Sequence, residues 1–164
     1  MTSYTTIQTP LLGDLMLVAN PTHLTGIYFT NHKHGPEIHK DWVHNPKHPV
    51  LVQAAEELQE YLRGQRTTFS VPLHAAGTDF QKKVWQQIAR IPFGETITYS
   101  ELARRAGAPE AIRAAGAATG RNPHSIIVPC HRVVGKNGAL TGYAGSLDRK
   151  KRLLGIEMPA LLND

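Results

Sequence analysis

The first thirty residues alternate apolar and polar positions, a pattern typical of strands that bury one face. Segments 3–10 (SYTTIQTP) and 14–19 (DLMLVA) flank the turn signal LLGD, and together they predict a β-hairpin. A third strand is expected at 23–30 (HLTGIYFT), and a polar, His-rich loop with two prolines follows at 31–48. The chain is therefore expected to begin with a short antiparallel sheet.

A helix is expected after this loop. Apolar residues recur at helical spacing across 50–64, where Gly64 is placed as a C-cap. The predicted apolar stripe consists of Val52, Ala55, Leu58 and Leu62. One more short strand is expected at 67–73 (TTFSVPL). Residues 1–75 are therefore interpreted as a small α/β domain in which a short antiparallel sheet packs with a helix.

The pattern changes to helices after a candidate linker at 74–77 (HAAG). Thr78 and Gln81 form a capping-box pattern at the start of a helix, which Pro92 ends. The apolar stripe of this helix consists of Phe80, Val84, Trp85 and Ile88. Residues 76–164 are interpreted as a mostly α-helical second domain, so the predicted fold class is α+β.

Two short helices are expected next. Thr98 and Glu101 repeat the capping box and open a helix over 99–107 (YSELARRAG). Pro109 stands at the first turn of a helix over 110–120 (EAIRAAGAATG). Two short helices joined by a tight, Gly-containing turn predict a helix-turn-helix unit.

Composition and charge narrow the class of protein. Hydrophobic residues make up 41% of the 164 residues, enough for a genuine core. No segment approaches the ~20 consecutive apolar residues of a membrane helix, and the N-terminus lacks the pattern of a signal peptide. Residues 1–75 carry 5 Lys/Arg against 6 Asp/Glu, whereas residues 76–164 carry 13 against 7. We expect a soluble, cytoplasmic protein whose basic second half meets a polyanion, most simply nucleic acid, with a solvated basic surface as the alternative.

Two groups of polar residues have ordinary interpretations. The histidines of the loop could in principle bind a metal, but their irregular spacing and the lack of a Cys partner favour a solvated loop. They are His32, His34, His39, His44 and His48. The run RKKR (149–152) and the pair Arg104–Arg105 could contact phosphates, although such runs are usually solvated surface. No metal site is predicted.

Candidate chemistry centres on Cys130, the single cysteine, which excludes an internal disulfide framework and a Cys-based zinc cluster. A lone cysteine beside an apolar run is commonly a small buried hydrophobe. Here His131 and Arg132 follow directly, and Pro129 restrains the backbone. Neighbouring basic groups favour the thiolate and lower the pKa of a thiol below about 8.5. Cys130 is therefore a candidate nucleophile with His131 as its base.

The segment NPHSIIVPCHRV, preceded by TYSELA and AIRAAG, resembles the O6-alkylguanine-DNA alkyltransferases, with the compact bacterial Ogt type the closest likeness. The resemblance runs from Thr78 to Glu157 and implies a mechanism. Cys130 would accept the alkyl group, and His131 would deprotonate it through a bridging water. The catalytic set that the family implies has three more members. Glu157 would orient His131 from just beyond the last turn of a helix. Asn122 would act as a hinge, and Tyr99 would donate a proton to the guanine.

The same resemblance implies how substrate is held. Arg113 would enter the duplex and replace a flipped nucleotide. The other residues implied in DNA binding are Ala114, Gly116, Thr98 and Arg121. The alkyl and base pocket would be formed by Tyr143, Ala144, Val133 and Pro129. The implied partner is double-stranded DNA containing O6-alkylguanine, with O4-alkylthymine as a second candidate. The protein is expected to be a monomer without a cofactor, with cooperative binding along DNA as an open alternative. The protein would be consumed, one molecule per lesion, and the N-terminal cysteines that hold zinc in some relatives are missing from this chain.

Two other classes of protein remain open at this point. A non-reactive DNA-binding module or damage sensor would explain the helix-turn-helix and the basic half, but not the set Cys130, His131 and Glu157. A cysteine hydrolase would explain Cys130 and His131 but does not require a helix-turn-helix. Adjacent Cys and His side chains also reach each other poorly.

Overall fold

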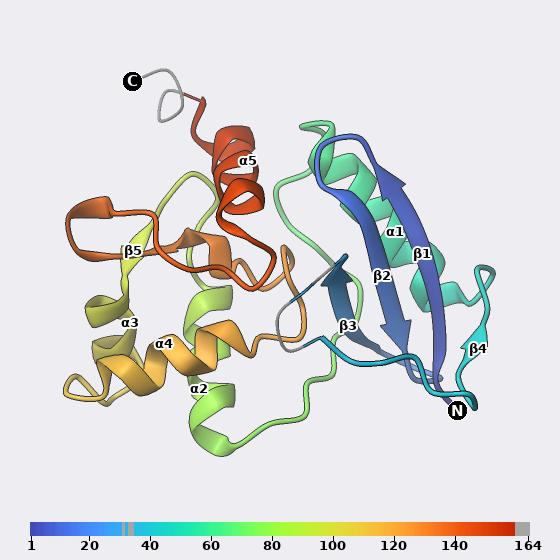
Figure 1. Ribbon diagram of the computed structural model, residues 1–164, viewed down its shortest axis with the longest axis horizontal. Coiled ribbons are helices and arrows are strands. Elements are labelled where there is room, and N and C mark those ends of the chain that lie inside the picture. Colours follow the sequence, from blue (N-terminus) through green and yellow to red (C-terminus); the bar gives the residue numbers. More distant parts are fainter. Residues whose placement is uncertain (31, 33–34, 160–164) are drawn as a thin grey trace.

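The computed structural model describes residues 1–30, 32 and 35–159 (Figure 1). The predicted hairpin is confirmed: strands β1 (Ser3–Thr9) and β2 (Gly13–Ala19) pair antiparallel. Gly13 opens β2 with φ of 79°, a backbone conformation that favours glycine. The third strand is also confirmed, since β3 (Leu24–Phe29) pairs antiparallel with β2.

A short strand lies inside the segment expected to be only a loop. Strand β4 (Val43–His44) pairs in parallel with β1, which gives the sheet order β3-β2-β1-β4. Both residues of β4 are exposed, so the sequence there shows no apolar alternation. The pairing of β4 depends on the position of β1 in the fold, so the local sequence pattern does not predict this strand.

Helix α1 (Pro49–Leu62) packs against the sheet, as expected. The predicted apolar stripe is confirmed at Leu58, which is buried, and at Ala55 and Leu62, which pack partly buried against the core, but it is wrong at Val52. Val52 is 38% exposed, whereas the residues of the neighbouring face are fully buried. That face consists of Leu51, Ala54, Leu58 and Tyr61. The helix begins with Pro49 at its first turn, and the His48 side chain accepts from the Val50 amide at 3.1 Å.

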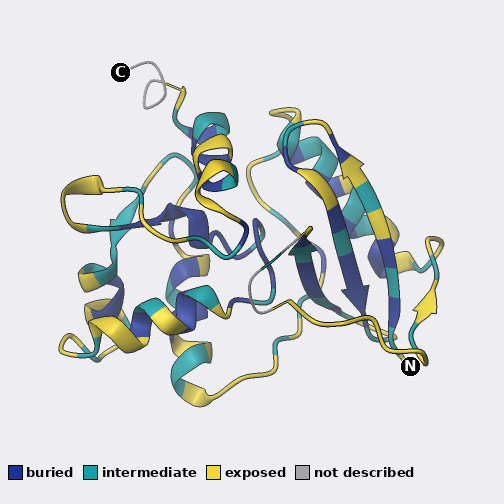
Figure 2. Cartoon of the chain, viewed as in Figure 1, coloured by how far each residue is buried: buried dark blue, intermediate teal, exposed yellow. Residues whose placement is uncertain are grey.

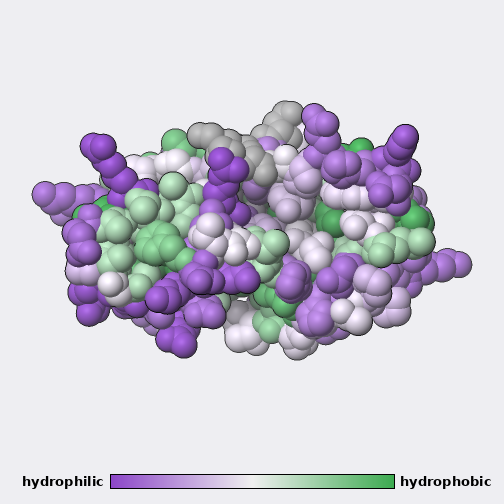
Figure 3. Space-filling model, turned by 90° about the horizontal axis from the view of Figure 1, so that it is seen from below, coloured by the Kyte–Doolittle hydropathy of each residue, from purple (hydrophilic) through white to green (hydrophobic). Residues whose placement is uncertain are grey.

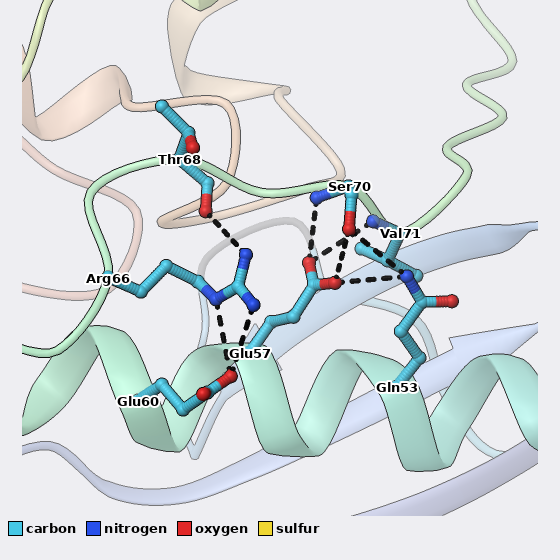
Figure 4. Close-up of polar contacts among 7 residues, drawn as sticks. All are labelled: Gln53, Glu57, Glu60, Arg66, Thr68, Ser70 and Val71. Carbon is cyan, nitrogen blue, oxygen red and sulfur yellow. Dashed lines mark hydrogen bonds and ion pairs between the residues drawn. The ribbon is translucent and has the colours of Figure 1, made fainter.

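The strand predicted at 67–73 is wrong. The Ser70 and Val71 amides donate instead to the buried Glu57 carboxylate of α1, at 2.8 and 3.1 Å (Figure 4). The Ser70 hydroxyl adds a third hydrogen bond at 2.7 Å. Only Leu73 forms a bridge to β3. A side-chain carboxylate thus takes the amides that a sheet ladder would have used.

Three helices form the other side of the molecule: α2 (Asp79–Ala89), α3 (Tyr99–Arg105) and α4 (Ile112–Gly120). Buried and exposed residues alternate along α4 (Figure 2). Trp85 of α2 donates its indole N–H to the carbonyl of Ala118 in α4 at 2.7 Å, which ties these two helices together.

The capping predictions differ in outcome. The first capping box is complete, because Thr78 accepts from the Gln81 amide and the Gln81 side chain accepts from the Thr78 amide. Thr98 also caps its helix, but Glu101 does not return to it. The Glu101 carboxylate pairs with Arg104 and Arg105, whose hydrogen bonds lower its pKa to about 2. This exposed arginine pair is therefore engaged by its own helix.

Pro109 does not open the next helix as predicted. It lies in the turn before α4, which starts at Ile112 after Ala111, a residue that provides no side-chain cap. The apolar pattern of the sequence continues through the turn, so it does not mark this boundary. Helix boundaries of this kind depend on caps rather than on periodicity.

Helix α5 (Leu147–Glu157) lies between the sheet and the three helices (Figure 1). Leu153 of α5 and Ile126 of the loop after α4 join the core formed by the sheet and α1. Val84, Leu102 and Ala115 belong to a second core formed by α2, α3 and α4. The second half of the chain thus supplies part of the first core.

The surface is mixed in character. On the face seen from below, patches of hydrophobic and hydrophilic residues interrupt one another (Figure 3). Among the helices of residues 1–30, 32 and 35–159, none is long and apolar enough to cross a membrane.

Candidate active site

Cys130 begins a 3₁₀ helix (Cys130–Arg132) that leads directly into strand β6 (Val133–Val134). This strand pairs in parallel with β5 (Ile97–Thr98), the strand immediately before α3. The pairing fixes Tyr99, the first residue of α3, near Cys130. Two residues that are distant in sequence therefore meet through a two-stranded sheet.

A pocket of about 480 Å³ opens onto Cys130. It contains six of the predicted site residues, namely Cys130, Tyr99, Gly116, Arg121, Tyr143 and Ala144. The lining residues that sequence reasoning missed are Ala117, Thr119, Gly120 and Gly142. Ala117, Thr119 and Gly120 belong to α4, and Gly142 lies in the loop before Tyr143. All four residues are small, and none is of a type that predicts a role in catalysis. The pocket therefore combines small residues with two tyrosines and one arginine around a single thiol.

Asn122 braces the loop that carries Cys130. Its Nδ2 donates to the Val128 carbonyl at 2.8 Å, and its Oδ1 accepts from the His124 amide at 3.0 Å. Both bonds are buried and lie within the turn that connects α4 to Cys130. The structure thus places Asn122 next to the loop rather than in the pocket lining.

The same loop contains two tight turns. The Ile127 amide donates to the Ser125 carbonyl at 3.0 Å across Ile126, which has φ of 76°. A left-handed β-branched residue costs about 1–3 kcal/mol and persists only where the surrounding contacts fix it. The Cys130 amide closes a second turn onto Val128 at 2.8 Å. The backbone that presents the thiol is therefore held in a specific, partly strained conformation.

His131 and Glu157 form a buried pair, as the family resemblance implied. Nε2 of His131 lies 2.8 Å from Oε2 of Glu157, and both side chains are 0% exposed. Burial alone would raise the pKa of Glu157, but the hydrogen bonds from His131 and Arg132 lower it to about 2. The ionised carboxylate can only accept, so Nε2 carries the proton. Glu157 is the last residue of α5, slightly earlier than the predicted position beyond the helix.

This tautomer leaves the other ring nitrogen as a lone-pair acceptor. Nδ1 of His131 is buried without a hydrogen-bond partner among the residues described. Burial lowers the pKa of His131, and the nearby Arg132 and Lys150 charges lower it further, although Glu157 opposes them. The imidazole is therefore neutral at neutral pH and able to accept a proton at Nδ1.

Sequence reasoning missed two further partners of Glu157. Arg132 donates Nε to Oε1 at 2.7 Å and Nη2 to Oε2 at 2.9 Å. Tyr61 of α1 donates its hydroxyl to Oε2 as well. Arg132 therefore faces Glu157 and not Cys130. Its place in the PCHRV motif was the only available signal, and nothing in the local sequence marked Tyr61.

The interpretation of RKKR as solvated surface is wrong for part of the run. Lys150 is 0% exposed and donates to the carbonyls of Val133 and Thr141 at 2.7 and 2.9 Å. Burial lowers its pKa to about 8, while the nearby Cys130 opposes this shift. Arg149 donates to the carbonyls of Leu12, Thr30 and Gly145. Lys150 therefore ties β6 to the segment at Thr141, and Arg149 ties the loop before α5 to the β1–β2 turn and the end of β3.

The pKa of the Cys130 thiol is raised, contrary to the expectation from its neighbours in sequence. Burial is the largest cause and outweighs the opposing effects of Asn122, the Lys150 charge and Tyr143. In the free protein the resting form is therefore the thiol. A nucleophilic role then requires a base to remove the proton during the reaction.

Two tyrosines of the pocket stay protonated. Burial, with a smaller effect of Cys130, raises the pKa of Tyr99, whose hydroxyl lies 3.5 Å from the Gly142 carbonyl. Burial and the neighbouring Cys130 raise the pKa of Tyr143 still more. Both phenols are therefore available as hydrogen-bond donors.

The remaining predicted residues lie around the pocket. Arg113 and Ala114 are exposed on the first turn of α4, ahead of the lining residues of that helix. Thr98 caps α3, while Pro129 and Val133 are buried on either side of the 3₁₀ helix. Helical spacing puts Arg113 on the same face of α4 as Gly116.

The histidine loop shows other contacts. His48 caps α1. The ring of His44 packs on Tyr4 and the ring of His39 packs on Trp42, each with ring centroids 5.4 Å apart. His34 lies outside the described residues. Within the described part of the chain, no group of three or more His, Cys, Asp or Glu side chains is arranged to hold a metal ion.

Comparison with known proteins places both halves of the chain in one family. Residues 79–159 match the model of the DNA-binding domain of 6-O-methylguanine DNA methyltransferase, and residues 2–75 match its ribonuclease-like domain. The chain belongs to the 6-O-methylguanine DNA methyltransferase family, which confirms the resemblance seen in the motifs.

Individual relatives align over nearly the whole chain. The chain is 47% identical to the constitutive methylated-DNA–protein-cysteine methyltransferase of Bacillus subtilis, over 96% of each protein. It is 45% identical to the methylated-DNA–protein-cysteine methyltransferase of Methanosarcina barkeri, over 94% of this chain and 96% of that one. The crystal structure of Mycobacterium tuberculosis OGT in complex with DNA matches with a TM-score of 0.88 and 41% identity, covering 96% and 93% of the two chains.

Proposed function

We propose that this protein repairs alkylated DNA by transferring the alkyl group of O6-alkylguanine to Cys130. It would act as a methylated-DNA–[protein]-cysteine S-methyltransferase. The observation that carries the proposal is the pocket, which presents one thiol beside a buried His131–Glu157 pair. The relatives named above, which align over nearly the full length, support the same activity.

Each atom of the transfer has a place among the side chains. The thiol proton passes through a bridging water to Nδ1 of His131, and Glu157 stabilises the imidazolium. The thiolate attacks the alkyl carbon, the bond from that carbon to O6 breaks, and the electron pair stays on O6. Tyr99 donates its proton toward this oxygen as negative charge develops. No cofactor is needed, and O4-alkylthymine, with a similar bond, is a second candidate substrate.

The product limits the reaction to one turnover. A thioether on Cys130 is stable, and the proposal includes no group that would remove the alkyl chain. Tyr143 and Ala144 would line the alkyl pocket. The Val133 carbonyl accepts from Lys150, and its second lone pair could accept from the guanine amine.

Duplex DNA is the proposed partner. In this proposal α3 and α4 form a helix-turn-helix unit, with Arg113 entering the duplex. An O6-alkyl group lies inside the helix, so the nucleotide must be flipped out at a cost of a few kcal/mol. Arg113 would lower this cost by filling the space. The other proposed DNA contacts are Thr98, Ala114, Gly116 and Arg121.

The proposal assigns the two halves of the chain different tasks. Residues 76–164 would bind DNA and transfer the alkyl group, and residues 1–75 would form a supporting domain. The basic charge of the second half agrees with this division. All proposed reacting side chains lie in one chain, so a monomer would suffice. We also propose a cytoplasmic location for the protein.

A single experiment tests the proposal against its alternatives. Duplex DNA carrying a radiolabelled methyl group on O6 of guanine is incubated, in molar excess, with the protein. We expect stable label on the protein, one methyl per molecule, and none on Cys130→Ser, which keeps DNA binding. Binding to the lesion without label transfer would support a damage sensor instead, and catalytic turnover of a simple ester would support a hydrolase. Either result, or repeated turnover by the wild-type protein, would overturn the proposal.

A further inference from the structure

Tyr61 connects the first half of the chain to the pair beside Cys130. It lies near the end of α1, is 0% exposed, and donates its hydroxyl to Oε2 of Glu157, 96 positions later. The same oxygen accepts Nε2 of His131 at 2.8 Å. A side chain of α1 thus contacts the carboxylate that orients the candidate base.

The direction of this hydrogen bond is settled by chemistry. Burial raises the pKa of Tyr61, and the Glu157 carboxylate raises it further. Because Glu157 itself is ionised, the phenol is the donor wherever the protein is folded. Tyr61 therefore keeps its phenolic proton and donates it in a hydrogen bond to Oε2.

The ring and the hydroxyl of Tyr61 have separable roles. The ring packs against Phe69 and Phe93, with centroids 5.5 and 6.3 Å away. Among the described residues, the hydroxyl donates a hydrogen bond to Glu157 and also interacts with the Arg132 guanidinium. A change to phenylalanine therefore keeps the packing and removes the donor.

Oε2 accepts three donors, namely Tyr61, His131 and Arg132. The donors share the negative charge of one oxygen, so each weakens the hold of the carboxylate on the others. The Tyr61 hydroxyl should accordingly reduce the stabilisation of a protonated His131. It also fixes the rotation of the carboxylate toward the imidazole.

We propose that Tyr61 is a positioning residue for alkyl transfer, acting through Glu157 on the proton affinity of His131. This inference rests on the proposed function, because it assigns Tyr61 a part in the activation of Cys130. It gives α1 a role in the chemistry beyond packing against the sheet.

The test compares Tyr61→Phe with the wild-type protein in two measurements. The first is the pKa of the His131 imidazole, followed by NMR. The second is the single-turnover rate with free O6-benzylguanine as a function of pH. With one donor fewer, Oε2 holds the imidazolium more tightly, so we expect the pKa of His131 and the acidic limb of the rate profile to move up together. A half-unit shift would slow the reaction about threefold on the acidic limb and much less on the alkaline side.

Two controls separate this effect from stability. Tyr4→Phe removes a hydroxyl from β1, where the ring packs on Trp42 and His44, and should leave the profile unchanged. Phe69→Leu loosens the packing around the Tyr61 ring without removing the hydroxyl. It should lower the melting temperature but leave the acidic limb in place.

A second variant keeps the inference testable if Tyr61→Phe does not fold. Site-specific replacement of Tyr61 by a fluorotyrosine strengthens the donor and should move the pKa of His131 and the acidic limb down. Identical profiles and identical His131 titrations in folded variants would overturn the inference. Failure of the wild-type protein to accept the alkyl group would overturn the proposed function instead, and the NMR titration would still decide whether Tyr61 controls His131.

Discussion

Arg132 binds both oxygens of Glu157, with Nε donating to Oε1 at 2.7 Å and Nη2 to Oε2 at 2.9 Å. The planar guanidinium matches the carboxylate, so the pair fixes the plane of the carboxylate as well as its charge. The preceding residue, His131, reaches the same carboxylate. One 3₁₀ turn therefore directs two adjacent basic side chains onto a single acid, while Cys130 faces the pocket.

Glu157→Gln should slow alkyl transfer and also destabilise the protein. A neutral amide no longer stabilises the imidazolium of His131, so we expect the single-turnover rate at neutral pH to fall about 100-fold, at the lower end of the range of general-base effects. The rate should recover partly at alkaline pH as the thiol ionises unaided. Loss of the ionic partner of buried Arg132 should lower the free energy of unfolding by about 3–5 kcal/mol.

Glu57→Gln is the matched control for this change. Glu57 is a buried carboxylate with several hydrogen bonds, but it anchors a loop to α1 away from the pocket (Figure 4). The Glu57→Gln substitution should destabilise the protein without altering the pH–rate profile of the folded fraction. A Glu157→Gln protein with the wild-type rate across the pH range would remove Glu157 from the mechanism.

Local rules predicted the parts of the molecule that depend on neighbouring residues. The capping box of Thr78 and Gln81, the hairpin and the PCHRV motif each carry their signal within a few positions. The family resemblance extended this to Glu157, far along the chain. The resemblance could do this because a family motif links residues that are distant in sequence but meet in the fold. Periodicity and capping patterns contain no such link.

Local rules failed where long-range contacts decide the outcome. Lys150 belongs to a charged run, and its burial follows from two carbonyl groups that the fold places around it. Tyr61 looks like an ordinary residue of an amphipathic helix. The left-handed conformation of Ile126 runs against the preference of a β-branched residue. In each case tertiary contacts outweigh the local preference.

Lys150→Met should weaken the activation of Cys130. The change removes a nearby positive charge that favours the thiolate, and it leaves the Val133 and Thr141 carbonyls without this donor. We expect a rise of about one unit in the thiol pKa and about a tenfold slower transfer at neutral pH. The pKa of Lys150 is about 8. The difference from wild type should therefore shrink as the pH rises through this value, because the wild-type lysine also loses its charge.

The thiol pKa can be measured by alkylation with iodoacetamide as a function of pH. Lys151→Met is the matched control, since its side chain is exposed next to the buried one. It should leave both the titration and the transfer rate close to wild type. A Lys150→Met titration that coincides with wild type would show that the lysine acts only through the loop it holds.

Arg113→Ala should separate DNA recognition from chemistry. The side chain is exposed at the start of α4 and lies outside the residues that line the pocket. If it fills the space of a flipped nucleotide, repair in duplex DNA should fall about 10- to 100-fold, in line with a flipping cost of a few kcal/mol. Reaction with free O6-benzylguanine needs no flipping and should stay within about twofold of wild type.

Arg63→Ala provides the charge-matched control, because Arg63 is an exposed arginine at the end of α1. It should change the two reactions equally little. Equal losses on duplex and free base in Arg113→Ala would show that Arg113 acts through folding or through the chemistry of the pocket.

His124 should make the protein sensitive to mild acid. Its Nε2 lies 2.8 Å from the Leu24 carbonyl, which can only accept, so the neutral ring donates this bond between the site loop and β3. Burial lowers the pKa of His124 to about 4, and the Leu24 hydrogen bond opposes this only in part. An unfolded histidine titrates near 6.5, so between these two values the unfolded chain binds more protons and stability falls as the pH falls. The free energy of unfolding should drop by about 2 kcal/mol between pH 7 and pH 5 through this group alone.

The measurement is urea unfolding of the wild-type protein and of His124→Gln at both pH values. Glutamine can donate to Leu24 but does not titrate, so the variant should lose about 2 kcal/mol less than wild type on acidification. His39→Gln, a change at an exposed histidine, should behave as wild type. Other buried groups such as His131 titrate in all three proteins and cancel in the comparison. Parallel losses in wild type and His124→Gln would mean that the acid sensitivity arises elsewhere, and His131 would be the next group to test.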